Sequence, residues 1–136
     1  MSWIDDRLVQ RRQQRERYRA IALNAENIYG HLWAEMAQCI EEAQTKGIDV
    51  IANGTPYERT VTVPDPPNSE LRVLTVSLDK AAQLISVSGL KSDFDLRFDV
   101  CQPHNRVCLK RGDSEITLHD AAQQILEPFI FPEFAS

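Results

Sequence analysis

The chain has 136 residues, of which 43% are hydrophobic and 26% charged, and its formal net charge is −5. This length and composition are typical of one globular domain and exclude disordered and collagen-like classes. No segment approaches the roughly 18 apolar residues of a membrane-spanning helix, and the acidic, amphipathic opening differs from a secretion signal. We therefore expect a single cytoplasmic domain over residues 1–136, without membrane contact.

Residues 1–46 carry the pattern of a long helix. Between Ile4 and Ala43 there is no proline and a single glycine, and strong helix formers predominate. Apolar residues recur every three or four positions from Tyr18 to Ala43, which places them on one side of the helix. Gly47 after Lys46 is suited to a left-handed C-cap. The sequence predicts one helix, or two consecutive segments, ending at this glycine.

Residues 47–118 change to an alternating pattern that is rich in β-branched residues. The links between apolar runs are too short for crossover helices, so neighbouring strands must be antiparallel. Asn53-Gly54 is interpreted as a tight hairpin turn and not as a glycosylation acceptor. We expect a mainly antiparallel sheet of five to seven strands, with candidates at residues 49–52, 57–63, 70–78, 83–88, 94–101, 106–110 and 115–118.

The clearest strand covers residues 94–101, where apolar and polar side chains alternate. Its apolar side needs a cover, and the long helix is the element that can supply it. A short helix is expected at residues 119–127, with Thr117 as its cap and Pro128 as its end, followed by an apolar tail at 128–136. The predicted fold class is α+β: a long N-terminal helix packed on the sheet, with a short C-terminal helix.

A cluster of arginines in the N-terminal helix is the most unusual feature of the sequence. Residues 11–19 contain five arginines and one glutamate, whereas residues 47–136 carry a net charge of −5. Three interpretations remain open: a solvated surface with ion pairs, an anion or nucleic-acid contact, and docking onto an acidic protein surface. The sequence pI of about 5.2 argues against a nucleic-acid partner. The candidate partner or anion site is Arg11, Arg12, Arg15, Arg17 and Arg19.

Two of the three cysteines form a candidate redox pair. A turn after Cys101 that pairs Gln102 with Val107 would place Cys101 directly opposite Cys108, near disulfide distance. The odd number of cysteines and the expected reducing compartment favour free thiols instead. His104, with His119 as a fourth ligand, would complete a zinc set, but a turn aims His104 poorly. We therefore predict no metal site.

Tyr29 and Trp33 lie four residues apart and form a second apolar ridge on the long helix. One side of this helix would cover the sheet and the ridge would meet a second copy, so Tyr29 and Trp33 are candidate interface residues of a homodimer. A heterologous protein partner is the alternative occupant of the same surface.

The preferred functional hypothesis is a non-catalytic interaction or adaptor protein that self-associates, or docks to a partner, through its long helix. One alternative is a small-ligand-binding or enzymatic domain with a pocket between helix and sheet, lined by Phe94, Leu96 and Phe98. Another is a local anion or nucleic-acid contact through residues 11–19. The sequence has neither a Gly-rich phosphate loop nor a paired-histidine metal helix, so we assign no catalytic residue and no cofactor.

Overall fold

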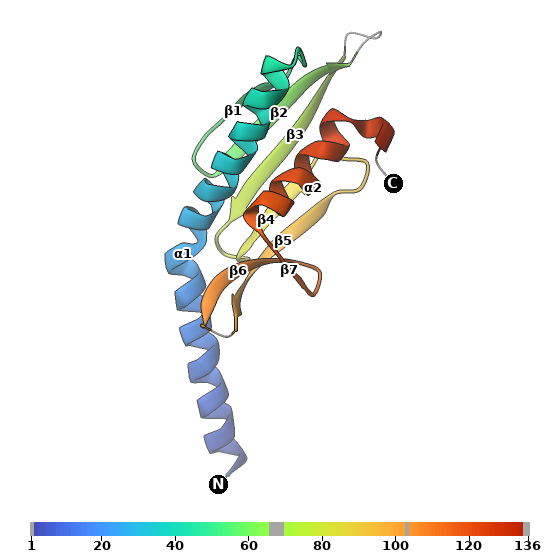
Figure 1. The fold of residues 1–136 in the computed structure, drawn as a ribbon. Helices are drawn as coiled ribbons and strands as arrows, with labels where there is room; N and C mark the ends of the chain where they lie inside the picture. Colours follow the sequence, from blue (N-terminus) through green and yellow to red (C-terminus); the bar gives the residue numbers. More distant parts are fainter. Residues whose placement is uncertain (1, 66–69, 103, 135–136) are drawn as a thin grey trace.

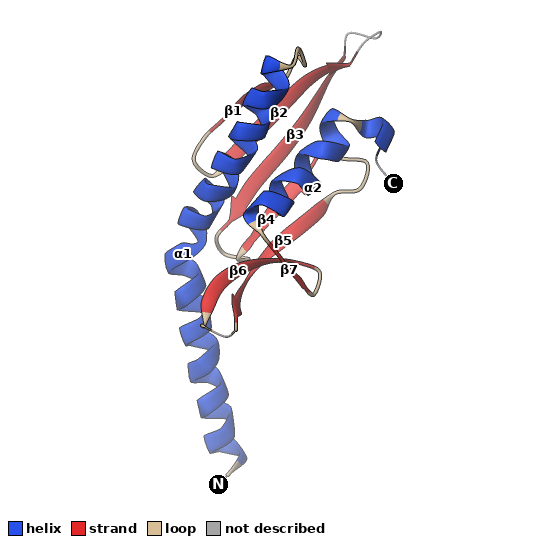
Figure 2. Cartoon of the chain, in the orientation of Figure 1, coloured by secondary structure: helices blue, strands red, loops and turns tan. Residues whose placement is uncertain are grey.

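The computed structural model describes residues 2–65, 70–102 and 104–134, and these residues form two layers (Figure 1). Helices α1 (Trp3–Thr45) and α2 (Leu118–Ile130) lie side by side on one face of an antiparallel sheet (Figure 2). A short 3-10 helix, η1 (Pro132–Phe134), follows α2. The predicted α+β class is confirmed. The strands are β1 (Ile51–Gly54), β2 (Glu58–Asp65), β3 (Glu70–Asp79), β4 (Leu84–Ser88), β5 (Phe94–Cys101), β6 (Arg106–Arg111) and β7 (Ser114–Ile116).

Helix α1 is continuous, and both of its ends have a physical cause. At the start, the Ser2 hydroxyl accepts a hydrogen bond from the Asp5 N–H at 3.2 Å. At the end, Gly47 adopts a φ of +90°, a left-handed conformation that glycine takes at little cost. The predicted C-cap is thereby confirmed. The buried stripe of α1 consists of Ile21, Ala25, Tyr29, Leu32, Met36, Ile40 and Ala43.

The sheet is a simple meander in which the spatial order of the strands, β1 to β7, follows the chain. Side chains on one face, such as Val76, Ile85 and Leu96, are fully buried beneath the helices. On the opposite face of β5, Asp95 and Arg97 are exposed. The predicted division into one buried and one wet face is therefore confirmed.

The first hairpin differs from the prediction, because Asn53 and Gly54 belong to β1 and the connection follows them. Gly54 has a φ of +142°, and a Cβ at this position would overlap the backbone of Glu58 and Arg59. The Thr55 N–H donates to the Glu58 carbonyl at 2.8 Å and closes the turn. The glycine thus permits a close approach of two strands and is not a turn residue.

Helix α2 begins as predicted and ends later. The Thr117 hydroxyl accepts a hydrogen bond from the Asp120 N–H at 3.1 Å. Pro128 lies inside the helix, which continues to Ile130. The carbonyl that this proline leaves unpaired belongs to the exposed residue Gln124, where water can hydrate it. Burial of Phe129 then favours a further turn of helix over a break.

Tyr29 and Trp33, the predicted interface ridge, both face the sheet. Tyr29 is 1% exposed, and its hydroxyl donates to the Val76 carbonyl. Burial is the main cause that raises the pKa of Tyr29 to about 12. Trp33 is half-buried, and the Arg59 guanidinium lies 5.0 Å from its ring centre. Tyr29 is therefore a core residue of the single chain, because the side of α1 that the sheet covers is broader than the stripe predicted.

Candidate functional site

The first part of α1 extends beyond the sheet, away from α2 (Figure 1). Every residue from Trp3 to Arg19 is exposed, and we call this segment the arm. Its apolar members are uncovered: Trp3 is 74% exposed and Leu8 is 50% exposed. Among the helices in the described ranges, none is both long and apolar enough to cross a bilayer. The arm is thus a helical segment that no other described part of the chain covers.

The predicted arginine site lies on this arm. Of the five arginines, Arg17 is the member that has an ion pair within the described part of the chain. Its partner is Asp99 on β5. The neighbouring Tyr18 carbonyl accepts a hydrogen bond from the Gln83 side chain at 2.8 Å. These contacts fix the base of the arm to the sheet and leave Arg11, Arg12, Arg15 and Arg19 exposed to solvent.

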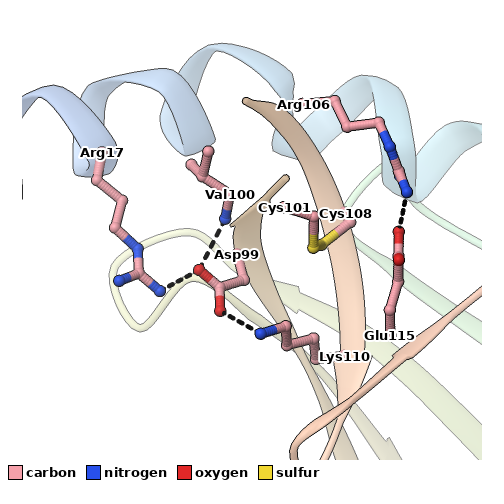
Figure 3. The surroundings of a disulfide bond; sticks show 8 residues. All are labelled: Arg17, Asp99, Val100, Cys101, Arg106, Cys108, Lys110 and Glu115. Atoms are coloured by element: carbon pink, nitrogen blue, oxygen red, sulfur yellow. Dashed lines mark hydrogen bonds and ion pairs between the residues drawn. A yellow bond between two sulfur atoms is a disulfide. The ribbon is translucent and has the colours of Figure 1, made fainter. Parts of the chain in front are cut away.

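Asp99 joins the arm to the sheet through several hydrogen bonds (Figure 3). One carboxylate oxygen accepts from Arg17 and from the Val100 N–H, the latter at 2.7 Å. The other oxygen lies 3.0 Å from the Lys110 ammonium. Partial burial opposes ionisation, but the hydrogen bonds from Lys110 and Val100 and the charge of Arg17 outweigh it. The pKa of Asp99 is therefore below its ordinary value.

The substitution Asp99→Asn is expected to lower the free energy of unfolding at pH 7 by roughly 1–2 kcal/mol, because charge-assisted hydrogen bonds are lost. A carboxyl group with a depressed pKa stabilises the fold above its unfolded value, and this stabilisation is lost as the pH falls through the folded value. The difference in the free energy of unfolding between wild type and variant should therefore become smaller below about pH 4. Urea unfolding at a series of pH values measures it, and a difference that widens in acid would contradict the assignment.

Cys101 and Cys108 form a disulfide with a Cα–Cα distance of 6.0 Å (Figure 3). The predicted register was wrong: Cys101 pairs with Arg106, and Cys108 pairs with Asp99, so the cysteines are diagonal neighbours. Asn105 adopts a φ of +50°, and the turn lies one residue earlier in the chain than expected. Residue 103 of this turn lies outside the described residues. The expectation of free thiols is wrong for these two cysteines, and the pair remains a candidate redox site.

Within the described residues, these two cysteines belong to a group of three side chains that could in principle hold a metal ion. Ligand atoms of Cys101, Cys108 and Glu115 lie within 4.8 Å of one another. The two sulfur atoms are bonded to each other, and Glu115 is paired with Arg106. His104 and His119, which were considered as zinc ligands, are not members of this group. The arrangement thus offers no free thiolate for a metal.

A groove of about 550 Å³ lies between α1 and α2. Apolar side chains from both helices and from the end of the chain line most of it, and Phe134 is 74% exposed there. Its lining also includes the ionisable residues Glu42, Lys46, His119 and Glu127. The larger apolar side chains that line it belong to Cys39, Ile48, Leu126, Ile130, Phe131 and Phe134.

Cys39 in this groove is a free thiol with low reactivity. Burial raises the pKa of the Cys39 thiol above its ordinary value, and the charges of Glu35 and Glu42 raise it further. A thiol of this kind stays protonated at neutral pH and is a poor nucleophile. Glu35 also lies 3.7 Å from His119 on α2.

The residues proposed to line a ligand pocket do not share one cavity. Leu96 and Phe98 are buried in the core, 0% and 5% exposed. Phe94 is half-buried, with the Arg111 guanidinium 3.9 Å from its ring centre. It borders a surface hollow of about 240 Å³ beside α2. These three residues therefore do not form the apolar wall of a ligand pocket with polar groups pointing into it.

Reasoning from the sequence did not find the groove. Its walls come from segments about eighty residues apart, and its only local signal was the apolar tail after Glu127.

Comparison with known proteins adds no further guide to the site. No protein-family model matches the chain, and neither a curated protein nor a solved structure is significantly similar to it.

Proposed function

We propose that this chain is a non-catalytic, cytoplasmic interaction protein that docks through its N-terminal arm. The observation that carries this proposal is the exposure of all residues from Trp3 to Arg19. Isolated helices need about 12–15 residues to be even marginally stable in water, so a helix of this kind gains most of its stability from packing. An arm without a cover in its own chain is best explained by a cover in another chain.

The composition of the arm favours a protein partner. It combines an uncovered apolar group, which includes Trp3 and Leu8, with six arginines and three acidic residues. Apolar side chains beside arginine are typical of protein interfaces. A nucleic-acid contact would use the same arginines, but the net charge of −5 would oppose it.

The test is a variant in which Arg11, Arg12, Arg15, Arg17 and Arg19 are replaced by glutamine. We expect self-association to weaken markedly at low salt, because exposed charges act over roughly 10 Å at 0.1 M salt. Light scattering at low and moderate salt measures it. The matched control removes five positive charges from the body of the domain: Lys80, Lys91, Arg97, Arg106 and Arg111, each replaced by glutamine.

Unchanged self-association in the arm variant would refute the proposal. A monomeric wild type whose melting temperature rises with a metabolite would favour the ligand-binding alternative instead. A salt-dependent oligonucleotide shift that disappears in the arm variant, but not in the control, would favour a nucleic-acid contact.

A further inference from the structure

The two parts of helix α1 carry opposite net charges. The arm carries six arginines against Asp5, Asp6 and Glu16, which gives a net charge of +3. Residues 20–45 of the same helix contain four glutamates and neither lysine nor arginine, which gives −4. Two such helices attract each other when they lie antiparallel and repel each other when they lie parallel.

The groove between α1 and α2 lies on the negative half of this helix. Its apolar lining includes Cys39, Ile130 and Phe131, and Glu42 and Glu127 stand beside that lining. Lys46 also lines the groove and pairs with Glu42 at 2.9 Å, so Glu127 supplies the negative charge that this pair leaves uncompensated. The groove therefore has the apolar floor and acidic margin that suit an amphipathic basic helix.

The arm has matching chemistry and a matching length. Ile4, Leu8, Arg11 and Arg15 follow one another at spacings of three or four residues, so they form one stripe on the helix. An arm of 17 residues is about 25 Å long, and the 13 residues of α2 span about 20 Å. The apolar start of the arm can therefore lie on the groove floor while its arginines reach the glutamates.

We infer that the arm occupies this groove on a second copy of the chain, with the two α1 helices antiparallel and related by a two-fold axis. Each copy then supplies one arm and one groove, as a self-complementary dimer requires. The inference rests on the proposed function and identifies its partner. The arm cannot fill the groove of its own chain, because α1 continues without a break from Trp3 to Thr45.

The contact area is sufficient for a specific dimer. A helical arm about 25 Å long and about 10 Å wide covers roughly 250 Å² of the surface beneath it. Two arms and two grooves together bury roughly 1,000 Å², which is near the lower limit for a specific interface. Pairing of the two arms with each other would instead bring Arg11 and Arg15 against arginines of the partner.

A charge exchange tests the inference in the full-length chain. The arm variant carries Arg11→Glu, Arg12→Glu and Arg15→Glu. The groove variant carries Glu42→Lys and Glu127→Lys in the groove, and Glu35→Lys at the residue beside it that contacts His119. Each variant alone should dimerise at least about a hundredfold more weakly than wild type, because like charges meet at both contacts. In a mixture, both contacts are complementary again, so the heterodimer should form with a mass twice the 15.5 kDa of one chain.

The control is a third variant with Asp93→Lys, Asp95→Lys and Asp113→Lys, which reverses three charges outside the arm and groove. It should dimerise like wild type. If the arm variant loses self-association but the groove variant dimerises like wild type, the arm is the docking element and the groove is not its site. That result would overturn this inference and leave the proposed function standing, whereas dimerisation by the arm variant alone would overturn both.

Cross-linking at alkaline pH, where the Cys39 thiol ionises, provides an independent measurement, because Cys39 lies in the groove. Single cysteines at Ile4, Leu8, Arg11 and Arg15 should include one that forms an oxidised dimer with Cys39 of a second copy. The additional substitution Cys39→Ala should abolish that dimer. Dimers that persist without Cys39 would show that the arms pair with each other, and a monomeric wild type at all concentrations would exclude a second copy as the occupant.

Discussion

Replacement of Leu32 by alanine should lower the free energy of unfolding by about 3–5 kcal/mol. Leu32 is 0% exposed and lies in the core that α1 forms with the sheet. The loss combines the transfer free energy of the deleted methyl groups with the cavity that remains, because a rigid helix over a sheet cannot fully collapse into the space. Urea unfolding followed by circular dichroism measures the change.

Leu23 provides the matched control on the same helix. It is 79% exposed, so Leu23→Ala makes the same chemical change without opening a cavity. Its effect should stay within about 0.5 kcal/mol. Similar losses in the free energy of unfolding for the two variants would mean that the face of α1 that carries Leu32 does not lie on the sheet.

The second large effect concerns the disulfide between Cys101 and Cys108. The double substitution to alanine should lower the free energy of unfolding by about 2–3 kcal/mol, since the cross-link closes a short loop in the unfolded chain. A reductant should destabilise the wild type by a similar amount and leave the double variant unchanged. Urea unfolding with and without dithiothreitol measures both effects.

Cys39→Ala is the control for this experiment, because it removes a thiol that has no disulfide partner. Its sensitivity to reductant should equal that of wild type. If the wild type itself is indifferent to reductant, the two cysteines do not act as a redox pair in solution.

Much of the fold follows from local patterns in the sequence. The helix ends at Gly47 and α2 begins after Thr117 because each cap depends on a few adjacent residues. The alternation in residues 94–101 indicates which face of the sheet is buried, and the short links impose antiparallel pairing. These features were predictable because each is decided within a few residues.

The errors arose where distant segments decide the outcome. Tyr29 was assigned to an interface because spacing alone does not show how wide a strip of helix the sheet covers. The local sequence predicts a helix end at Pro128, but burial of Phe129 favours continuation of the helix. The register at Cys101 depended on Asn105 adopting a positive φ. The groove between α1 and α2 was not predicted because it requires knowledge of how two helices pack.

The meander has a consequence for how the chain reaches its native state. Each strand bonds to the strand that follows it in the chain, so the sheet can grow by successive hairpins while the polypeptide is still being synthesised. The second α-helix, α2, packs against α1, and the core closes only when α2 is complete. A ribosome-bound intermediate therefore exposes the apolar surface that α2 covers until late in translation, and aggregation and chaperone capture should concentrate at this stage.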